Sequence, residues 1–143
     1  MKKRVLILCT HNSSRSQMAE GLLRAAAGKD IEVESAGTEA TRVHPLAVKA
    51  MAERGIDITG HTSKTLGRFL NQPWDVVITV CDSANETCPV FPKAGRRIHW
   101  SFEDPSQATG SEEARLAVFR RIRDEIDARF KAWLANGDLV VGP

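Results

Sequence analysis

Residues 5–23 read VLILCTHNSSRSQMAEGLL, an aliphatic run that leads through a polar loop into apolar residues at helical spacing. The run Lys3–Leu8 predicts a buried strand, because short continuous aliphatic stretches are typical of parallel strands covered on both faces. After the loop, the spacing predicts a helix from about Ser16 to Ala27, which Gly28 would end. The stretch therefore predicts a strand, a tight polar loop and a helix in direct succession.

The loop Cys9–Ser16 contains residue types that can hold a tetrahedral oxyanion. Loop amides entering a helix amino terminus converge on anions, and the helix dipole adds favourable potential. Arg15 can donate to two oxygens at once, and Asn12 tolerates the left-handed backbone that a tight cradle often requires. We expect these loop residues to bind the anion: Thr10, His11, Asn12, Ser13, Ser14, Arg15 and Ser16.

Cys9 is the candidate nucleophile of this loop. A positive environment stabilises a thiolate, so we expect its pKa to fall from about 8.5 into the range of roughly 3.5 to 7.5. Ser16 could donate its hydroxyl to the sulfur. The alternative is a buried cysteine that ends a strand before an ordinary loop. The strand before it, the helix after it and the small polar residues between disfavour that alternative.

Strands and helices alternate along the rest of the chain. Further strands are predicted at Ile31–Glu34, Val76–Val80 and Arg97–Trp100, and helices at Pro45–Gly55, near Leu66–Leu70 and from Ser111 to Gly137. This alternation predicts a parallel sheet of about four strands with helices on both faces, in which ligands bind beyond the carboxyl ends of strands. All three cysteines and Asp104 follow predicted strands, so we expect them at that edge.

The size and composition of the chain limit its class. With 143 residues it is expected to form one domain, 1–143, and 20 basic against 18 acidic residues give no reason to expect a nucleic-acid partner. Its apolar runs are far shorter than the about eighteen residues of a membrane span, so we expect a cytoplasmic protein without a membrane partner. Cysteines in that reducing compartment serve catalysis, redox chemistry or metal binding more often than structure.

The segment Cys9–Glu20, CTHNSSRSQMAE, resembles the signature loop of the thioredoxin-coupled arsenate reductases, which share the low-molecular-weight protein tyrosine phosphatase fold. The similarity continues through Ser35–Thr38, Gly55–Asp57, His61–Ser63, Val80–Asp82, Cys88-Pro89 and Asp104-Pro105, and thus spans nearly the whole chain. It implies an α/β fold of three layers, with a four-stranded parallel sheet flanked by helices.

Cys81 and Cys88 have six residues between them, too many for a Cys-x-x-Cys redox motif, and no second ligand pair suggests zinc. Taken alone, they could also be two reduced cysteines with no joint role. The resemblance implies a relay in which Cys9 attacks arsenate and Cys81 then attacks Cys9, releasing arsenite. Cys88 next attacks Cys81, and thioredoxin, the electron donor, reduces the resulting disulfide.

Asp104 is the candidate general acid, because expelling an oxygen from arsenate or phosphate needs a proton. An Asx-type turn before Pro105 explains the same residue without catalysis. The resemblance to the Asp-Pro of the family favours the catalytic interpretation.

We expect no metal and no bound cofactor. The histidines, His11, His44, His61 and His99, do not form a metal pattern and are assigned structural roles. Glu20 with Asn12 and Ser35 resembles the ligands of a monovalent cation site in some family members. Lys64, two positions after Thr62, stands where those members have an acidic residue, and its ammonium could replace the ion.

The resemblance implies arsenate reduction for arsenic detoxification by a monomer, with phosphate and sulfate as competing anions. The alternative function is a phosphotyrosine or other phosphomonoester phosphatase that uses Cys9, Arg15 and Asp104. The chain has no tyrosine to stack on such a substrate, and hydrolysis does not need the cysteine pair, so only weak phosphatase activity is expected. A non-enzymatic thiol sensor is the third hypothesis, but the sequence has no recognisable DNA-reading element.

Overall fold

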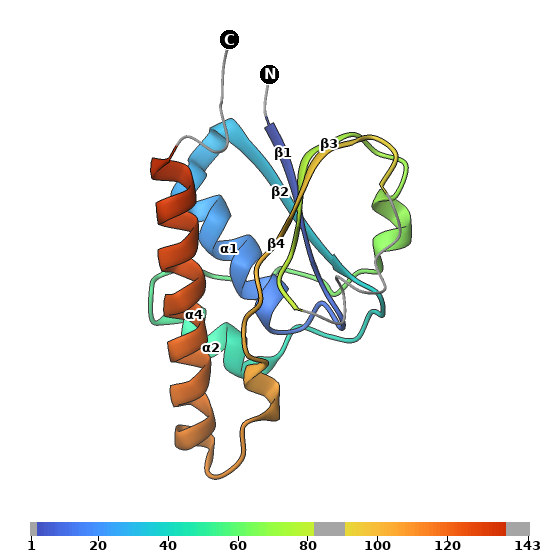
Figure 1. The fold of residues 1–143 in the computed structure, drawn as a ribbon. Coiled ribbons are helices and arrows are strands. Elements are labelled where there is room, and N and C mark those ends of the chain that lie inside the picture. Colours follow the sequence, from blue (N-terminus) through green and yellow to red (C-terminus); the bar gives the residue numbers. More distant parts are fainter. Residues whose placement is uncertain (1–2, 82–90, 137–143) are drawn as a thin grey trace.

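The computed structural model describes residues 3–81 and 91–136. Its strands β1 (Lys3–Cys9), β2 (Ile31–Gly37), β3 (Trp74–Thr79) and β4 (Ala94–His99) form one sheet in the order β2-β1-β3-β4. Every strand pair is parallel, and Figure 1 shows β1 between its neighbours. The predicted four-stranded parallel sheet is confirmed.

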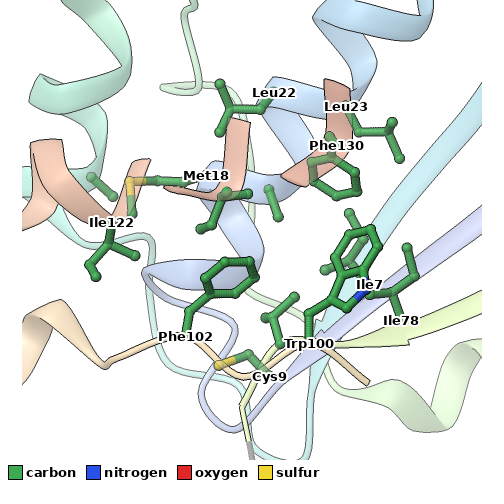
Figure 2. Close-up of a cluster of buried hydrophobic side chains, with 14 of the residues drawn as sticks. Ile7, Cys9, Met18, Leu22, Leu23, Ile78, Trp100, Phe102, Ile122 and Phe130 are labelled. Atoms are coloured by element: carbon green, nitrogen blue, oxygen red, sulfur yellow. The ribbon is translucent and has the colours of Figure 1, made fainter. Parts of the chain in front are cut away.

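The long helices cover one face of this sheet. They are α1 (Arg15–Ala27), α2 (Pro45–Ala52) and α4 (Glu112–Ala135), and they lie together in Figure 1. Val5 and Ile7 of β1 pack on this side in a cluster with Met18 and Phe130 from the helices (Figure 2). Short 3-10 segments, η1 (Gly28–Asp30), η2 (Leu66–Phe69) and η3 (Pro105–Gln107), occur in the connections.

The opposite face of the sheet is covered by a short helical segment, at the place of the short helix predicted near Leu66–Leu70. Leu6 and Leu8 pack there against Phe69 of η2, Trp74 and Phe91. Within residues 3–81 and 91–136, the helical cover on this side is thus the short segment η2 and not a long helix. Both faces of β1 are nevertheless buried, as its continuous aliphatic run predicted.

The fourth strand begins three residues earlier than predicted. β4 starts at Ala94, which pairs with Trp74, whereas the sequence placed the start at Arg97. Its residues are mostly exposed, so the hydrophobic pattern contains little information about where the strand begins. Pairing with β3 sets the boundary instead.

The terminal helix α4 follows its pattern closely. The Ser111 hydroxyl accepts a hydrogen bond from the Ala114 N–H at 3.1 Å, which caps the helix before an acidic first turn. Its predicted apolar face is buried: Leu116, Phe119, Ile122, Ile126, Phe130 and Trp133. In the described part of the chain, no helix is long and apolar enough to cross a membrane.

The end of β2 supports the loop that follows β1. A Cβ added to Gly37 would lie 2.6 Å from the Thr10 carbonyl oxygen and 2.8 Å from the Asn12 nitrogen. Real side chains do not approach backbone that closely, so only glycine fits here. The absence of a side chain at Gly37 therefore lets the Cys9 loop lie directly against β2.

Candidate active site

Asn12 holds the shape of the loop between β1 and α1. Its φ of 48° is in the left-handed region, as the sequence predicted. Its fully buried amide donates to Ser16 Oγ and Ser35 Oγ, each at 2.9 Å. Its carbonyl oxygen accepts from Gln17 Nε2 at 3.0 Å and from the Lys64 N–H at 2.8 Å. One side chain thus joins the loop to α1, to β2 and to the segment before η2.

The loop and the segment that contains Asp104 enclose a small pocket. It is lined by Cys9, His11, Ser13, Ser14, Arg15, Asp104 and Ser106. Ser14 is at the N-cap of α1, but its side chain makes no capping hydrogen bond. Its hydroxyl and Arg15 Nε are both buried and have no partner among the described residues. Hydrogen-bond donors without partners beside a helix amino terminus favour the binding of an anion.

Arg15 connects the loop with Asp104, which lies far away in the sequence. Its Nη1 donates to the Phe102 carbonyl oxygen at 3.0 Å, and its Nη2 is 3.5 Å from Asp104 Oδ2. The Arg15 side chain is only 12% exposed. The predicted meeting of these two residues at one edge of the sheet is confirmed.

Asp104 both caps a short segment and faces the pocket. Its Oδ1 accepts hydrogen bonds from the Ser106 N–H at 3.0 Å and the Ser106 hydroxyl at 2.7 Å, which is an Asx-type turn. Burial raises the pKa of the carboxyl, but the Ser106 hydrogen bonds and the charge of Arg15 outweigh burial and hold it below its ordinary value. The free carboxyl is therefore ionised at neutral pH.

The structure also brings two of the cysteines together. Cys9 ends β1, Cys81 follows β3, and both are free and buried. The Cys81 sulfur hydrogen bonds with the Thr10 hydroxyl at 3.3 Å, and its side chain also hydrogen bonds with Cys9. Cys88, the third cysteine of the predicted relay, lies outside the described residues.

The expected lowering of the Cys9 pKa is wrong for this arrangement. The hydrogen bond with Cys81 is the largest influence and raises the pKa well above the ordinary value, and burial raises it further. The charge of Arg15 and a backbone hydrogen bond from Thr10 act in the opposite direction but do not prevail. The prediction failed because the sequence did not place a second thiol against the first. The Ser16 hydroxyl accepts a hydrogen bond from the Asn12 side-chain amide at 2.9 Å and keeps its own proton as a donor.

A buried charge cluster lies beneath the loop. Glu20 is 3% exposed. Its carboxylate accepts a hydrogen bond from the Ser35 hydroxyl and forms an ion pair with Arg24 at 2.9 Å. Lys64 Nζ donates to the Thr62 carbonyl at 3.0 Å and lies 3.9 Å from Glu20 Oε1. The Lys64 ammonium thus lies near the Glu20 carboxylate, which resembles a ligand of the monovalent cation site in some family members. Within the described ranges, no group of three or more His, Cys, Asp or Glu side chains could hold a metal ion.

Sequence reasoning missed Gln17 and Ser106. Gln17 Nε2 donates to the Asn12 carbonyl and side chain and to the Thr62 carbonyl, and its Oε1 lies 3.0 Å from His61 Nδ1. A fully buried glutamine in a first helical turn has to find partners, but the sequence does not say which. The backbone contact of Ser106 could have been found, because an aspartate side chain in an Asx-type turn accepts from the N–H two residues on.

The comparisons with known proteins agree with this fold. The family model for low molecular weight phosphotyrosine protein phosphatase matches residues 4–139. The chain belongs to that family. Several of its relatives are arsenate reductases. An arsenate reductase of Halalkalibacterium halodurans is 49% identical over 136 residues, covering 95% of this chain and 98% of the relative.

Solved structures of the family show the same relationship. An arsenate reductase in the phosphate-binding state superimposes with a TM-score of 0.81 and 36% identity, covering 94% of this chain and 98% of that one. A thioredoxin-dependent arsenate reductase of Corynebacterium glutamicum matches with a TM-score of 0.73 and 31% identity, covering 96% of this chain and 63% of that one. Arsenate reductases in oxidised, reduced and intermediate states are also similar.

Proposed function

We propose that this protein reduces arsenate to arsenite through a disulfide relay that thioredoxin resets. The observation that carries the proposal is the contact between two buried thiols, Cys9 and Cys81, beside an anion-sized pocket that Arg15 closes. A phosphatase of this fold needs only the first thiol. The names of the relatives and the phosphate-bound state of one of them support both the reaction and the pocket as its site.

The first step forms a bond between sulfur and arsenic. Arsenate is held by the loop amides of residues 10–16 and by Arg15, whose charge offsets the charge of the anion. The Cys9 thiolate attacks arsenic of the protonated anion, and one arsenate hydroxyl group takes a proton and leaves as water. Because the hydrogen bond to Cys81 raises the pKa of Cys9, forming this thiolate requires that contact to loosen as the anion binds.

Asp104 supplies the proton for the leaving oxygen in this proposal. Its carboxyl is ionised in the free protein, so it must take up a proton before it can act. An arsenate anion bound beside it disfavours a second negative charge, which raises the pKa of the carboxyl and favours protonation. The anion also shares the charge of Arg15, which otherwise stabilises the carboxylate.

The second thiol makes the reaction a reduction. Cys81 attacks the Cys9 sulfur, the electron pair of the sulfur–arsenic bond stays on arsenic, and arsenite leaves. Two thiols have then become one disulfide, which balances the two electrons gained by arsenic. Cys88 would next attack Cys81 and free Cys9, leaving a Cys81–Cys88 disulfide that thioredoxin reduces.

A phosphomonoester phosphatase is the alternative, since the same pocket and thiol could form a phosphocysteine. The contact between Cys9 and Cys81 disfavours it as the main activity, because it raises the pKa of the nucleophile with no benefit for hydrolysis. We propose weak phosphatase activity as a side reaction. We also propose a single-domain cytoplasmic monomer, for which phosphate and sulfate compete with arsenate and nucleic acid is no partner.

The deciding experiment measures arsenite formed by the purified protein with thioredoxin, thioredoxin reductase and NADPH. Hydrolysis of p-nitrophenyl phosphate is measured in parallel. The Cys9→Ser variant should lose both activities. Cys81→Ser should lose arsenate reduction, including its first turnover, and Cys88→Ser should lose only multiple-turnover reduction. Cys88→Ser should stop after one turnover with Cys9 bonded to Cys81. Sustained reduction by either variant of the pair would refute the relay.

A further inference from the structure

Ser106 lies in the pocket wall and has no role in the relay described above. It is exposed, it lines the same pocket as Cys9 and Arg15, and its hydroxyl and N–H both donate to Oδ1 of Asp104. The N–H alone would complete the cap of the short segment η3. The hydroxyl adds a second donor to the same oxygen, at the shorter distance of 2.7 Å.

Two donors on one carboxyl oxygen distinguish the two oxygens chemically. Oδ1 of Asp104 has its acceptor capacity largely used by Ser106, so it is the poorer place for a proton. Oδ2 faces Arg15 Nη2 at 3.5 Å, and Arg15 lines the pocket. The Gln107 side chain also hydrogen bonds with the Asp104 carboxyl. Without the Ser106 hydroxyl, Oδ1 loses its shorter Ser106 contact, and we expect the carboxyl to rotate more freely about its Cβ–Cγ bond.

We infer that Ser106 is a positioning residue for the reaction: its hydroxyl fixes Oδ1 of Asp104, so that Oδ2 carries the proton into the pocket. The inference rests on the proposed role of Asp104 as general acid. The proton comes from solvent to Oδ2 and passes to the leaving arsenate oxygen, which departs as water. Asp104 ends the step as a carboxylate held in place by Ser106.

Several charged groups also act on Asp104 and have to be separated from Ser106. Arg15 of α1 faces Oδ2, and His44, at the start of α2, interacts with the carboxyl electrostatically. Cys9 and His11 line the same pocket. Replacing Ser106 leaves all of these groups in place, so a change in the titration of Asp104 would report the hydroxyl itself.

The test compares Ser106→Ala with Ser106→Thr, which keeps a hydroxyl at the same position. Carbon-13 NMR of aspartate-labelled, reduced protein follows the titration of the Asp104 carboxyl, with Asp104→Asn to assign its signal. The pH dependence of a single turnover of arsenate reduction, without thioredoxin, is measured for the same proteins. Melting temperatures and phosphate affinities control for folding and for the integrity of the pocket.

Ser106→Ala should raise the pKa of Asp104, because a hydrogen bond to the ionised form is lost. Its single-turnover rate should fall by about fivefold at low pH, where the acid is protonated but misoriented, with phosphate affinity unchanged. The decline of the rate at higher pH should move upward with the pKa. Ser106→Thr should match the wild type in all three measurements.

The outcomes separate this inference from the proposed function. If the titration and the rate profile of Ser106→Ala equal those of the wild type while Asp104→Asn is slow, the inference about Ser106 is wrong and the acid role stands. If Asp104→Asn reacts at the wild-type rate, the acid role fails and the inference fails with it. An equal rate loss in Ser106→Thr would indicate a purely steric effect and would also overturn the inference.

Discussion

The hydroxyl of Thr10 lies 3.3 Å from the sulfur of Cys81 and connects the anion-binding loop with the second thiol. A hydroxyl donor at this distance stabilises a thiolate, so it would favour Cys81 as the attacking group of the second step. The two residues come from the carboxyl ends of adjacent strands, β1 and β3. Pairing of these strands therefore determines which thiol can reach the Cys9 adduct.

Replacing Thr10 with valine should slow formation of the Cys9–Cys81 disulfide. Valine keeps the shape of threonine and removes the hydroxyl, and a hydrogen bond to a charged sulfur is worth about 1.5 kcal/mol, or roughly tenfold in rate. Counting free thiols after rapid mixing of reduced protein with arsenate measures this step. Thr10→Ser should react like the wild type, and hydrolysis of p-nitrophenyl phosphate should change less. A wild-type rate in Thr10→Val would show that the contact has no kinetic role.

Gly37→Ala should disrupt the anion pocket. The new Cβ would lie 2.6 Å from the Thr10 carbonyl oxygen and 2.7 Å from that of Glu39, so the loop or the strand has to shift. We expect a loss of about 2 kcal/mol in the free energy of unfolding, as for other overpacked sites, and loss of thermal stabilisation by phosphate. Gly60→Ala is the control, because nothing lies within 4 Å of its added Cβ. Normal phosphate binding by Gly37→Ala would contradict this account.

The shape of the Cys9–Ser16 loop was the part of the site that the sequence predicted best. Its chemistry is local: the nucleophile, the arginine and the left-handed Asn12 all lie within eight consecutive residues, between a clear strand and a clear helix. The position of Asp104 and Cys81 at one edge of the sheet was predicted from the alternation of strands and helices. The parallel sheet puts all carboxyl strand ends on one side, so distance in the sequence did not obscure their meeting.

The features that the sequence did not predict depend on contacts between segments that are distant in the chain. The direction of the Cys9 pKa was predicted wrongly, because it is set by how closely Cys81 approaches in three dimensions. Likewise, the start of β4 depends on pairing with β3, and its exposed residues have no hydrophobic pattern. The hydrogen bond from Gln17 to the Thr62 carbonyl is a third case, since backbone acceptors cannot be recognised from residue types.

Potassium should not stabilise the wild-type protein. Lys64 Nζ already donates to the Thr62 carbonyl and lies near Glu20, so a cation would meet an ammonium at this position. Lys64→Gln removes that charge and leaves the buried Glu20 with less compensation. We expect the variant to melt at a lower temperature than the wild type and to regain stability in potassium chloride. Choline chloride at equal ionic strength is the control, and a potassium-dependent rise in the wild type would refute the prediction.

His44 should make the stability of the protein depend on pH. Its Nδ1 accepts a hydrogen bond from the Leu46 N–H at 3.1 Å, which caps α2, and its ring packs on Phe119 with the centroids 4.7 Å apart. Protonation at Nδ1 would abolish the cap. Burial is the largest cause that lowers the pKa of His44, and the charges of Arg115 and Arg42 lower it further.

The sign of the effect follows from proton counts in the two states. Between the lowered pKa of folded His44 and the ordinary value of about 6.5, the unfolded chain binds more protons than the folded protein. Stability therefore rises with pH through this window, is fully present above about 6.5, and is lost as the pH falls through the folded pKa. His61, whose pKa is also lowered by burial, should act in the same direction.

His44→Asn tests this directly, because asparagine caps helices well but does not titrate. Urea unfolding of the reduced proteins at a series of pH values between about 5 and 8 gives the free energy of unfolding in each case. The variant should show a shallower rise of stability with pH than the wild type, with the remaining slope due to His61 and other groups. If both proteins show the same slope, protonation of His44 is not linked to folding, and its low pKa has no consequence for stability.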